Sequence, residues 1–263
     1  MINNRTNCRS AISDLRARIG QIERGKKSTK LEFISPSVIR TGITELDSHL
    51  PDGGLTLGAL HEITIPTPAD TAAATSFCMS LLSSLLQTRK GIALWCQNSD
   101  MLDTGEIYPP CLIQHGIAPD RLIFLRLKRD DDILWAMEEA LHSHGPACVL
   151  GEIAHTNLTK TRRLQTAANE ADLPAIILHP GWQGTWNSAA ATRWRIKTNQ
   201  SRPYGLAKTL NEPGNPLWQV ELYRCRRGAP GIWKMEFQNE KGNLSLAAPA
   251  SNGPDNSCST DIA

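Results

Sequence analysis

The sequence predicts an α/β protein with a mostly parallel central sheet flanked by helices, antiparallel strands at the C-terminal end and an N-terminal amphipathic helix. Two observations predict this fold class. From residue 41 onward, nearly continuous apolar runs alternate with helical segments, which is typical of a parallel sheet covered on both faces. After residue 190, apolar and polar residues alternate, which is typical of antiparallel strands with one wetter face.

The N-terminal segment predicts one amphipathic helix over residues 10–23. Its apolar stripe, which recurs with a helical period, consists of Ile12, Leu15, Ile19 and Ile22. The polar residues 25–32 then predict a linker. A stripe of this kind must be buried, either on its own domain or on another subunit, and the sequence leaves both alternatives open.

Five parallel strands and three intervening helices are predicted for the core. The strands cover residues 59–65, 91–97, 121–127, 147–153 and 174–179. The helices cover residues 71–88, 131–143 and 157–171. Because strands and helices alternate, right-handed crossovers are expected to connect them.

Three further strands are predicted to be antiparallel. They cover residues 193–197, 218–224 and 232–237. The last stretch of the chain is rich in Asn, Ser, Gly and Pro, which predicts a disordered tail. The expected organisation is therefore an N-terminal helix and linker (1–40), a core domain (41–237) and the tail (238–263).

The composition argues against several classes of protein. The 263-residue chain has a formal net charge of +2, which is too small to indicate nucleic-acid binding by the whole chain. Seven cysteines without a C-x-x-C pair predict reduced thiols in the cytoplasm, and no disulfide framework or zinc site. No apolar run approaches the ~20 residues that a membrane span needs. The histidines form no metal-binding motif, so we expect no metal.

The segment between the first core strand and the following helix is the most informative part of the chain. A phosphate-binding loop here would read G-x-x-x-x-G-K-[ST], with glycines that wrap the phosphates and a lysine that binds them. The chain has instead Ile65, Pro66, Thr67, Pro68, Ala69, Asp70, Thr71 and Ala72. This degenerate loop has neither Gly nor Lys, so we expect no nucleotide cofactor and no enzymatic activity.

Asp70 adds to this expectation. It stands where a helix N-cap belongs, and we expect its carboxylate to accept the first N–H groups of the following helix. A negative charge in this position would repel a triphosphate. The sequence also lacks a clear catalytic carboxylate after the second strand, because that strand runs into Ser99. Asp100 and Glu106 are less direct candidates for this role. Glu152, at the end of the fourth strand, is expected to make structural hydrogen bonds.

The C-terminal third is locally basic, with nine Lys and Arg against three Glu between residues 190 and 237. The candidate basic surface consists of Arg193, Arg195, Arg224, Arg226 and Arg227. A solvated strand face, a contact with a protein and a weak contact with DNA all remain open. Lys160, Arg162 and Arg163 likewise form either a solvated helix face or a contact for an acidic partner.

Several motifs occur together in order. They are LRARIGQIE, TGITELDSHL, LPDGGLTLGALHEI, ACVLGEI, LTKTRRLQTAANEADLPAIILHP, RWRIK and WQVELYRCRRGAPGIWKMEF. In this order and spacing the chain resembles the RecA-like superfamily, and within it the ImuA family of bacterial mutagenesis cassettes. The resemblance covers nearly everything except the tail, and it implies a RecA-like core with a degenerate phosphate loop.

The resemblance also implies a function. It implies a non-enzymatic accessory role in SOS-induced translesion synthesis, through contacts with RecA and an ImuB-type polymerase-like partner and, indirectly, with an error-prone replicative-type polymerase. The apolar stripe would then dock on RecA. The alternatives are a divergent RecA- or KaiC-like ATPase, a cell-division inhibitor of the SulA type and a single-stranded DNA-binding module.

Overall fold

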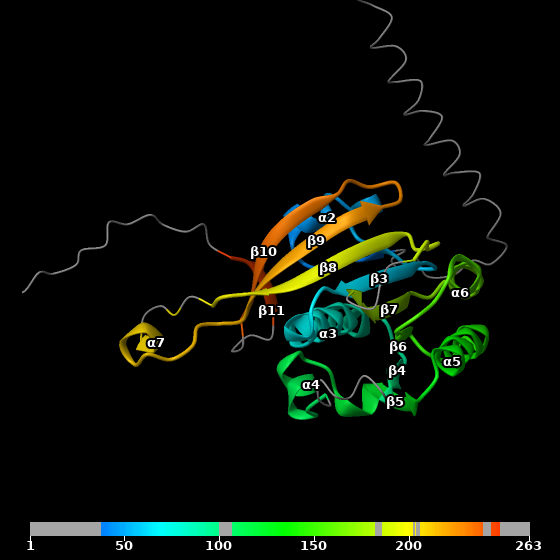
Figure 1. Ribbon diagram of the computed structural model, residues 1–263, viewed down its shortest axis with the longest axis horizontal. Helices are drawn as coiled ribbons and strands as arrows, with labels where there is room; N and C mark the ends of the chain where they lie inside the picture. The colour runs from blue at the N-terminus through cyan, green and yellow to red at the C-terminus, as the bar shows by residue number, and fades with distance from the viewer. Residues whose placement is uncertain are drawn as a thin grey trace, which may run out of the picture. The chain divides into compact units, whose positions relative to one another are not determined.

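A nine-stranded sheet runs through the residues that the computed structural model describes, which are 38–99, 107–181, 186–201, 203, 206–238 and 243–247 (Figure 1). In spatial order its strands are β11 (Asn243–Leu246), β10 (Gly231–Gln238), β9 (Leu217–Cys225), β8 (Thr192–Asn199), β3 (Leu60–Ile65), β7 (Ala175–Pro180), β6 (Cys148–Glu152), β4 (Ala93–Asn98) and β5 (Leu122–Leu127). The neighbours from β8 to β5 pair in parallel, and those from β8 to β11 pair antiparallel. The predicted mostly parallel sheet with antiparallel C-terminal strands is therefore confirmed.

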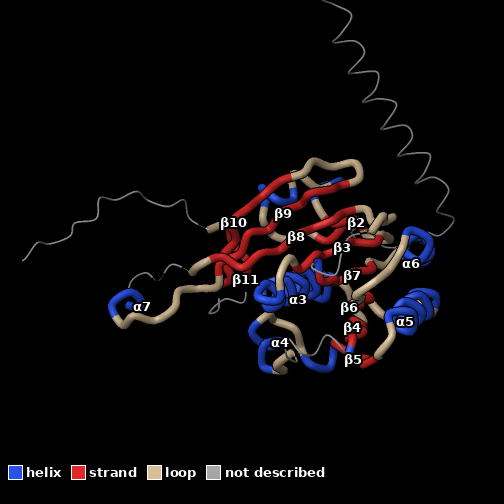
Figure 2. Tube along the Cα trace, in the orientation of Figure 1, coloured by secondary structure: helices blue, strands red, loops and turns tan. Residues whose placement is uncertain are grey.

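Helices cover both faces of the parallel part of the sheet (Figures 1 and 2). One face packs against α3 (Thr71–Thr88) and α4 (Pro110–Gln114), and the other against α5 (Asp130–His142) and α6 (Leu158–Ala171). Buried side chains on the α3 side include Phe77, Trp95, Leu150, Leu178 and Trp194. Those on the α5 and α6 side include Leu60, Ile133, Val149, Leu164 and Ile177. The sheet thus separates two apolar cores.

The central strands are apolar throughout because both of their faces are covered. Every residue of β6 is buried, and the register places Leu150 toward α3 and Val149 toward α5 and α6. Gly151 lets α5 pack closely on this strand, because a Cβ at this position would lie 2.3 Å from Sδ of Met137 and 2.9 Å from Cγ2 of Ile133.

Strand β8 joins the two parts of the sheet. One of its edges pairs in parallel with β3 and the other pairs antiparallel with β9, with an irregularity between Arg193 and Trp194. Its side chains alternate as predicted, since Trp194 and Ile196 are buried in the α3 core. Arg193 and Arg195 point to the opposite face, above β3 and β9.

Several smaller elements were not predicted. They are β1 (Val38–Ile39), α2 (Thr44–Asp47), β2 (Leu55–Thr56), α4 and α7 (Leu206–Thr209). Strand β11 lies within the predicted disordered tail, so that prediction is wrong for its four residues. The reason is that Leu244 and Leu246, two residues apart, both pack on the α3 core while their backbone pairs with β10. The predicted N-terminal helix and its stripe lie outside the described residues.

Cys96 and Cys148 lie in the central strands as buried apolar residues, as predicted. Burial raises the pKa of both thiols to about 12, and for Cys96 the nearby Glu152 adds to the effect. These thiols are therefore unreactive at neutral pH. Among the helices that the structure describes, none combines the length and the apolar character that crossing a membrane requires.

Candidate functional site

The turn between β3 and α3 lies at the carboxyl edge of the parallel strands, where open α/β sheets bind their ligands. The short helix η2 (Pro68–Asp70) bridges the end of β3 and the start of α3. Helical winding therefore begins at Pro68 and continues into α3 without a glycine. Pro68 suits this first position because its fixed φ matches a helix and its missing N–H is not needed there.

The carboxylate of Asp70 holds this turn closed. Its Oδ2 accepts hydrogen bonds from the backbone N–H of Thr67 (3.1 Å) and from Oγ1 of Thr67 (2.7 Å). Its Oδ1 accepts one from the backbone N–H of Thr198, near the end of β8 (2.7 Å). Only 7% of Asp70 is exposed. The carboxylate thus links the turn to the neighbouring strand.

This geometry corrects the expectation that Asp70 caps α3. The carboxylate makes no hydrogen bond to the first turn of that helix. Because winding already starts at Pro68, Asp70 is the third residue of the combined helix, and it reaches back to the residue that precedes it. Asp70 does lie at the start of the helix, as predicted, but its carboxylate accepts hydrogen bonds from Thr67 and Thr198 and not from the first turn of α3.

Three backbone N–H groups of this turn, those of Thr67, Asp70 and Thr71, are already paired. Thr67 donates to Asp70, Asp70 donates to the carbonyl of Thr67 (2.9 Å), and Thr71 donates to the carbonyl of Pro68. Pro66 and Pro68 have no N–H to offer. A phosphate cradle needs several such donors aimed at one anion, whereas here they point into the turn itself.

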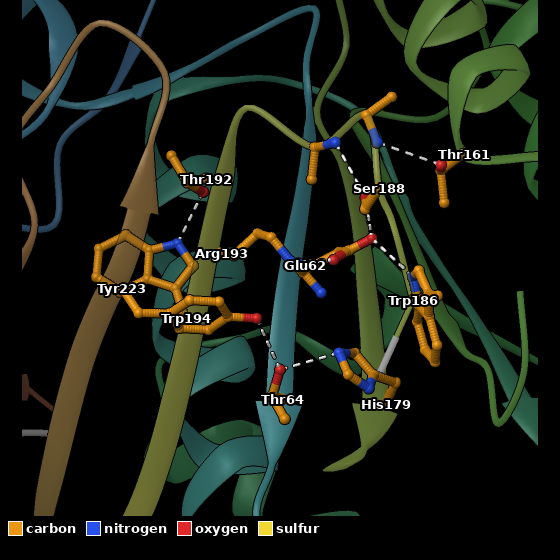
Figure 3. A network of polar contacts seen from close by, with 12 residues as sticks. Glu62, Thr64, Thr161, His179, Trp186, Ser188, Thr192, Arg193, Trp194 and Tyr223 are labelled. Carbon is orange, nitrogen blue, oxygen red and sulfur yellow. Dashed lines mark hydrogen bonds and ion pairs between the residues drawn. The ribbon is translucent and has the colours of Figure 1, made fainter. Parts of the chain in front are cut away.

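A buried ion pair joins β3 and β8 on the face of the sheet away from α3 (Figure 3). Glu62 is fully buried, and its Oε2 lies 2.7 Å from Nε of Arg193 in β8, whose side chain is 11% exposed. The other oxygen, Oε1, accepts hydrogen bonds from Ser188 and from Nε1 of Trp186 (3.3 Å). Ser188 also accepts the N–H of Ala190 (3.0 Å). Through Ser188 and Trp186, Glu62 thus holds in place the segment that leads into β8.

A second set of polar contacts continues from this pair toward β9 (Figure 3). Oγ1 of Thr64 contacts Nε2 of His179 (2.9 Å) and the hydroxyl of Tyr223 (3.4 Å). The guanidinium groups of Arg193 and Arg195 lie 5.3 and 5.0 Å from the centre of the Tyr223 ring. Burial, and then the charge of Arg193, lower the pKa of His179 to about 3. This imidazole is neutral at neutral pH.

His61 is buried on the other face of β3. Its Nδ1 lies 2.8 Å from Oγ1 of Thr192, and its Nε2 lies 2.9 Å from the carbonyl oxygen of Thr56. Burial lowers its pKa to about 4, against the opposing effect of the Thr56 hydrogen bond. The ring ties β2 and β8 to β3, which is a structural role.

Glu152 makes structural hydrogen bonds to β4. Its Oε1 accepts from Nε1 of Trp95 (2.8 Å), and its Oε2 accepts from the backbone N–H of Asn98 (3.3 Å). Burial raises the pKa of this carboxyl, partly offset by these bonds. Asp100 and Glu106 lie outside the described residues. In the described part of the chain, no group of three or more His, Cys, Asp or Glu side chains could hold a metal ion.

The five arginines of the candidate basic surface are only partly brought together. Arg193 neutralises Glu62, Arg195 pairs with Glu221 (2.8 Å) and Arg226 donates to the carbonyl of Ala189 (3.0 Å). Arg224, Arg226 and Arg227 are exposed. Two of the five charges are therefore balanced by carboxylates of the same chain, which the local charge count could not show.

Glu62 was not predicted from the sequence as a functional or structural site, although the sequence contains a signal for it. A carboxylate within the apolar run 59–65 must be buried, and a buried carboxylate needs a cation. Its partner, Arg193, lies far along the chain in a strand that alternates charged and apolar residues. The pairing of these two strands brings the charges together.

Comparison with known proteins identifies relatives. The chain is 32% identical over 216 residues to Protein ImuA of Caulobacter vibrioides strain NA1000 / CB15N, across 76% of this chain and 84% of the relative. Protein ImuA of strain ATCC 19089 / CIP 103742 / CB 15 gives the same values. No family model matches the chain.

The buried pair predicts unequal costs for two arginine substitutions. Arg193→Met leaves Glu62 buried without a counter-charge and is expected to lower the free energy of unfolding by about 3–5 kcal/mol. Arg195→Met breaks a more exposed pair and is expected to cost at most about 1 kcal/mol. Urea unfolding of both variants measures the difference. Glu62→Gln combined with Arg193→Met should recover part of the loss, and equal costs for the two single variants would contradict the assignment.

The buried imidazoles predict acid sensitivity. His61 and His179 have lower pKa values in the folded chain than the ordinary value near 6.5, so the unfolded chain binds more protons below that pH. The stability that these two neutral imidazoles contribute is therefore present above pH 6.5 and is lost progressively as the pH falls toward 4. Each imidazole is expected to cost about 2 kcal/mol between pH 7 and pH 5. Unfolding at both pH values should show a smaller loss of stability for His179→Gln than for the unsubstituted chain, and an equal loss would contradict the prediction.

Proposed function

The chain belongs to the ImuA family, and we propose that it is a non-enzymatic, RecA-like accessory protein of SOS-induced mutagenic translesion synthesis. It acts by binding other proteins, namely RecA and an ImuB-type polymerase-like partner, and through that partner an error-prone replicative-type polymerase. It works in the cytoplasm and turns over no nucleotide.

The turn between β3 and α3 is the observation that carries this proposal. A nucleotide-driven motor needs free backbone donors and a lysine at this position. Here Asp70 occupies the turn, its carboxylate is satisfied by Thr67 and Thr198, and the N–H of Thr67 is used. The turn is complete without a ligand, which supports a role that depends on shape and surface.

The arrangement of the strands supports the RecA-like part of the proposal. The first core strand, β3, lies in the interior of the sheet between β7 and β8, and the helix behind it, α3, crosses one face to reach β4. A domain of this shape can present the surfaces of a RecA protomer to a filament end without hydrolysing ATP. The N-terminal stripe would then pack on the neighbouring protomer.

The closed turn predicts that the chain does not bind nucleotide. The full chain is expected to show no saturable binding of a fluorescent ATP analogue with Mg²⁺, because three backbone donors of the turn are paired, the turn has no lysine, and Asp70 would face the phosphates. Fluorescence polarisation measures this, with RecA protein as the positive control.

Micromolar affinity for the analogue would overturn the proposal. Loss of ATP hydrolysis in Glu152→Gln would then favour a divergent ATPase. Binding of the analogue without hydrolysis would also contradict the prediction that the turn between β3 and α3 holds no phosphate. This conclusion would not depend on the result for Glu152→Gln.

The proposed function predicts that association with RecA depends on the N-terminal apolar stripe. Leu15→Asp combined with Ile19→Asp is expected to abolish association with RecA, because two charges would interrupt the apolar stripe. Pull-down with purified RecA measures the association, and thermal unfolding checks that the core is intact. Arg18→Ala combined with Gln21→Ala, on the polar side of the same predicted helix, serves as the matched control. Undiminished association of the Asp variant would refute the docking model.

A further inference from the structure

The face of β8, β9 and β10 that points away from α3 is open to solvent. On the α3 side these strands bury Trp194 and Met235 in the core. Alternate residues point to the opposite face, where Lys197, Ile232 and Lys234 are exposed. Of the described helices, α5 and α6 pack on the parallel strands of that side, mainly on β3, β4, β6 and β7 (Figure 1). They leave the face of β8, β9 and β10 available to a partner.

A hollow of about 510 Å³ lies at one end of this face, where the strands meet α7. Lys208 of α7 and Lys234 of β10 line it, together with the polar side chains of Asn199, Gln200 and Ser201. None of the described Asp or Glu residues lines it. The hollow therefore combines two cations with polar groups and contains no competing carboxylate.

The strand register adds a third lysine to this surface. Lys197 in β8 and Lys234 in β10 both stand opposite Gln219 in β9, and residues opposite each other lie on the same face of a sheet. Because neighbouring strands lie about 4.8 Å apart, the backbones at these two lysines are about 10 Å apart. Within the described part of the chain, neither these lysines nor Lys208 form an ion pair.

The carboxylates of this region are engaged or lie elsewhere. Glu221, on the same face, pairs with Arg195 (2.8 Å). Oε1 of Glu236 accepts a hydrogen bond from Nδ2 of Asn215 (2.9 Å). Glu212 is exposed in the loop before β9 and does not line the hollow. The three lysines therefore keep their charge available.

The charge of the whole region is also positive after every carboxylate is counted. Nine Lys and Arg stand against three Glu between residues 190 and 237, and Glu62, which neutralises Arg193, makes a fourth carboxylate. The excess is five positive charges, whereas the complete chain has a net charge of only +2. The rest of the chain is therefore net negative, and the positive charge is concentrated in this region.

The chemistry of this face favours a phosphate backbone over a protein partner. Its free cations are lysines, which act as point charges and bind phosphate without the planar geometry of arginine. Amide and hydroxyl side chains such as those in the hollow are also frequent phosphate contacts. The binding energy of a protein interface is instead dominated by aromatic and arginine anchors. Here Trp218 is buried in the α3 core, and the Tyr223 ring is flanked by Arg193 and Arg195. Ile232 is a single exposed apolar residue, which needs no explanation.

We propose that Lys197, Lys208 and Lys234, which we call the lysine face, bind the phosphate backbone of a nucleic acid without reading its sequence. This inference goes beyond the proposed function, in which the chain acts by binding proteins, and does not depend on it. None of the three lysines belongs to the candidate basic surface that the sequence predicted.

Binding of a fluorescent oligonucleotide of mixed sequence to the full chain tests the lysine face. Fluorescence polarisation over a series of salt concentrations should show an affinity that falls as salt rises. Lys197→Gln combined with Lys234→Gln should weaken binding about tenfold or more at low salt. Each phosphate contact of a single strand contributes about 0.7 to the slope of log affinity against log salt, so the slope should fall by about 1.4.

The matched control removes the same charge elsewhere. Lys90 and Lys128 are exposed in the turns after α3 and β5, and Lys90→Gln combined with Lys128→Gln should leave both affinity and slope nearly unchanged. Equal losses in the two double variants would show a general effect of net charge and would overturn the proposal. Absence of binding at low salt would do the same.

An acidic partner protein is the competing occupant. A polyglutamate peptide that binds as tightly as an oligonucleotide of equal charge, and loses affinity in the Lys197→Gln, Lys234→Gln variant, would assign the face to protein and overturn the proposal. Lysine-dependent binding of the oligonucleotide, as a single strand or as a duplex, supports it. Association with RecA is measured for the same variants and is expected to be unchanged, so failure of the proposed function and failure of the lysine face are distinguishable.

Discussion

The carboxylate of Asp70 joins three parts of the fold, and the functional conclusions depend on it. It closes the turn after β3, sets where α3 begins winding and reaches across to the backbone of Thr198 in β8. A phosphate placed here would have to break these hydrogen bonds and lie against a buried negative charge. The charge that a ligand would bring to this edge is thus already supplied by the chain.

The Glu62–Arg193 pair makes a second link between the same two strands, on the opposite face from α3. Burying two charges is costly, and a pair of this kind is weak support for overall stability. It does specify pairing, because β8 can satisfy Glu62 only when Arg193 stands opposite it. With Asp70 at the strand end, it fixes the junction where the parallel part of the sheet meets the antiparallel part.

The sequence predicted what depends on neighbouring residues and missed what depends on distant ones. The apolar run 59–65 and the helix 71–88 follow from local periodicity, and the structure has both. The distant partner of Asp70, Thr198, and the ion-pair partner of Glu62, Arg193, both lie in β8, which no local pattern specifies. Strand β11 was missed because the polar composition of the tail outweighed the spacing of its two leucines.

A protein without a nucleotide cycle cannot use hydrolysis to release its partners. Its complexes must form and separate according to affinity and concentration alone, because a ligand shifts an equilibrium only by its differential affinity for the two states. Such a protein benefits from preformed surfaces, since little ordering free energy is then lost on binding. The closed turn at Asp70, which is held by the chain's own hydrogen bonds, meets this requirement. On the proposed function, the same sheet that in a motor would transmit the state of a nucleotide would hold binding surfaces in fixed positions.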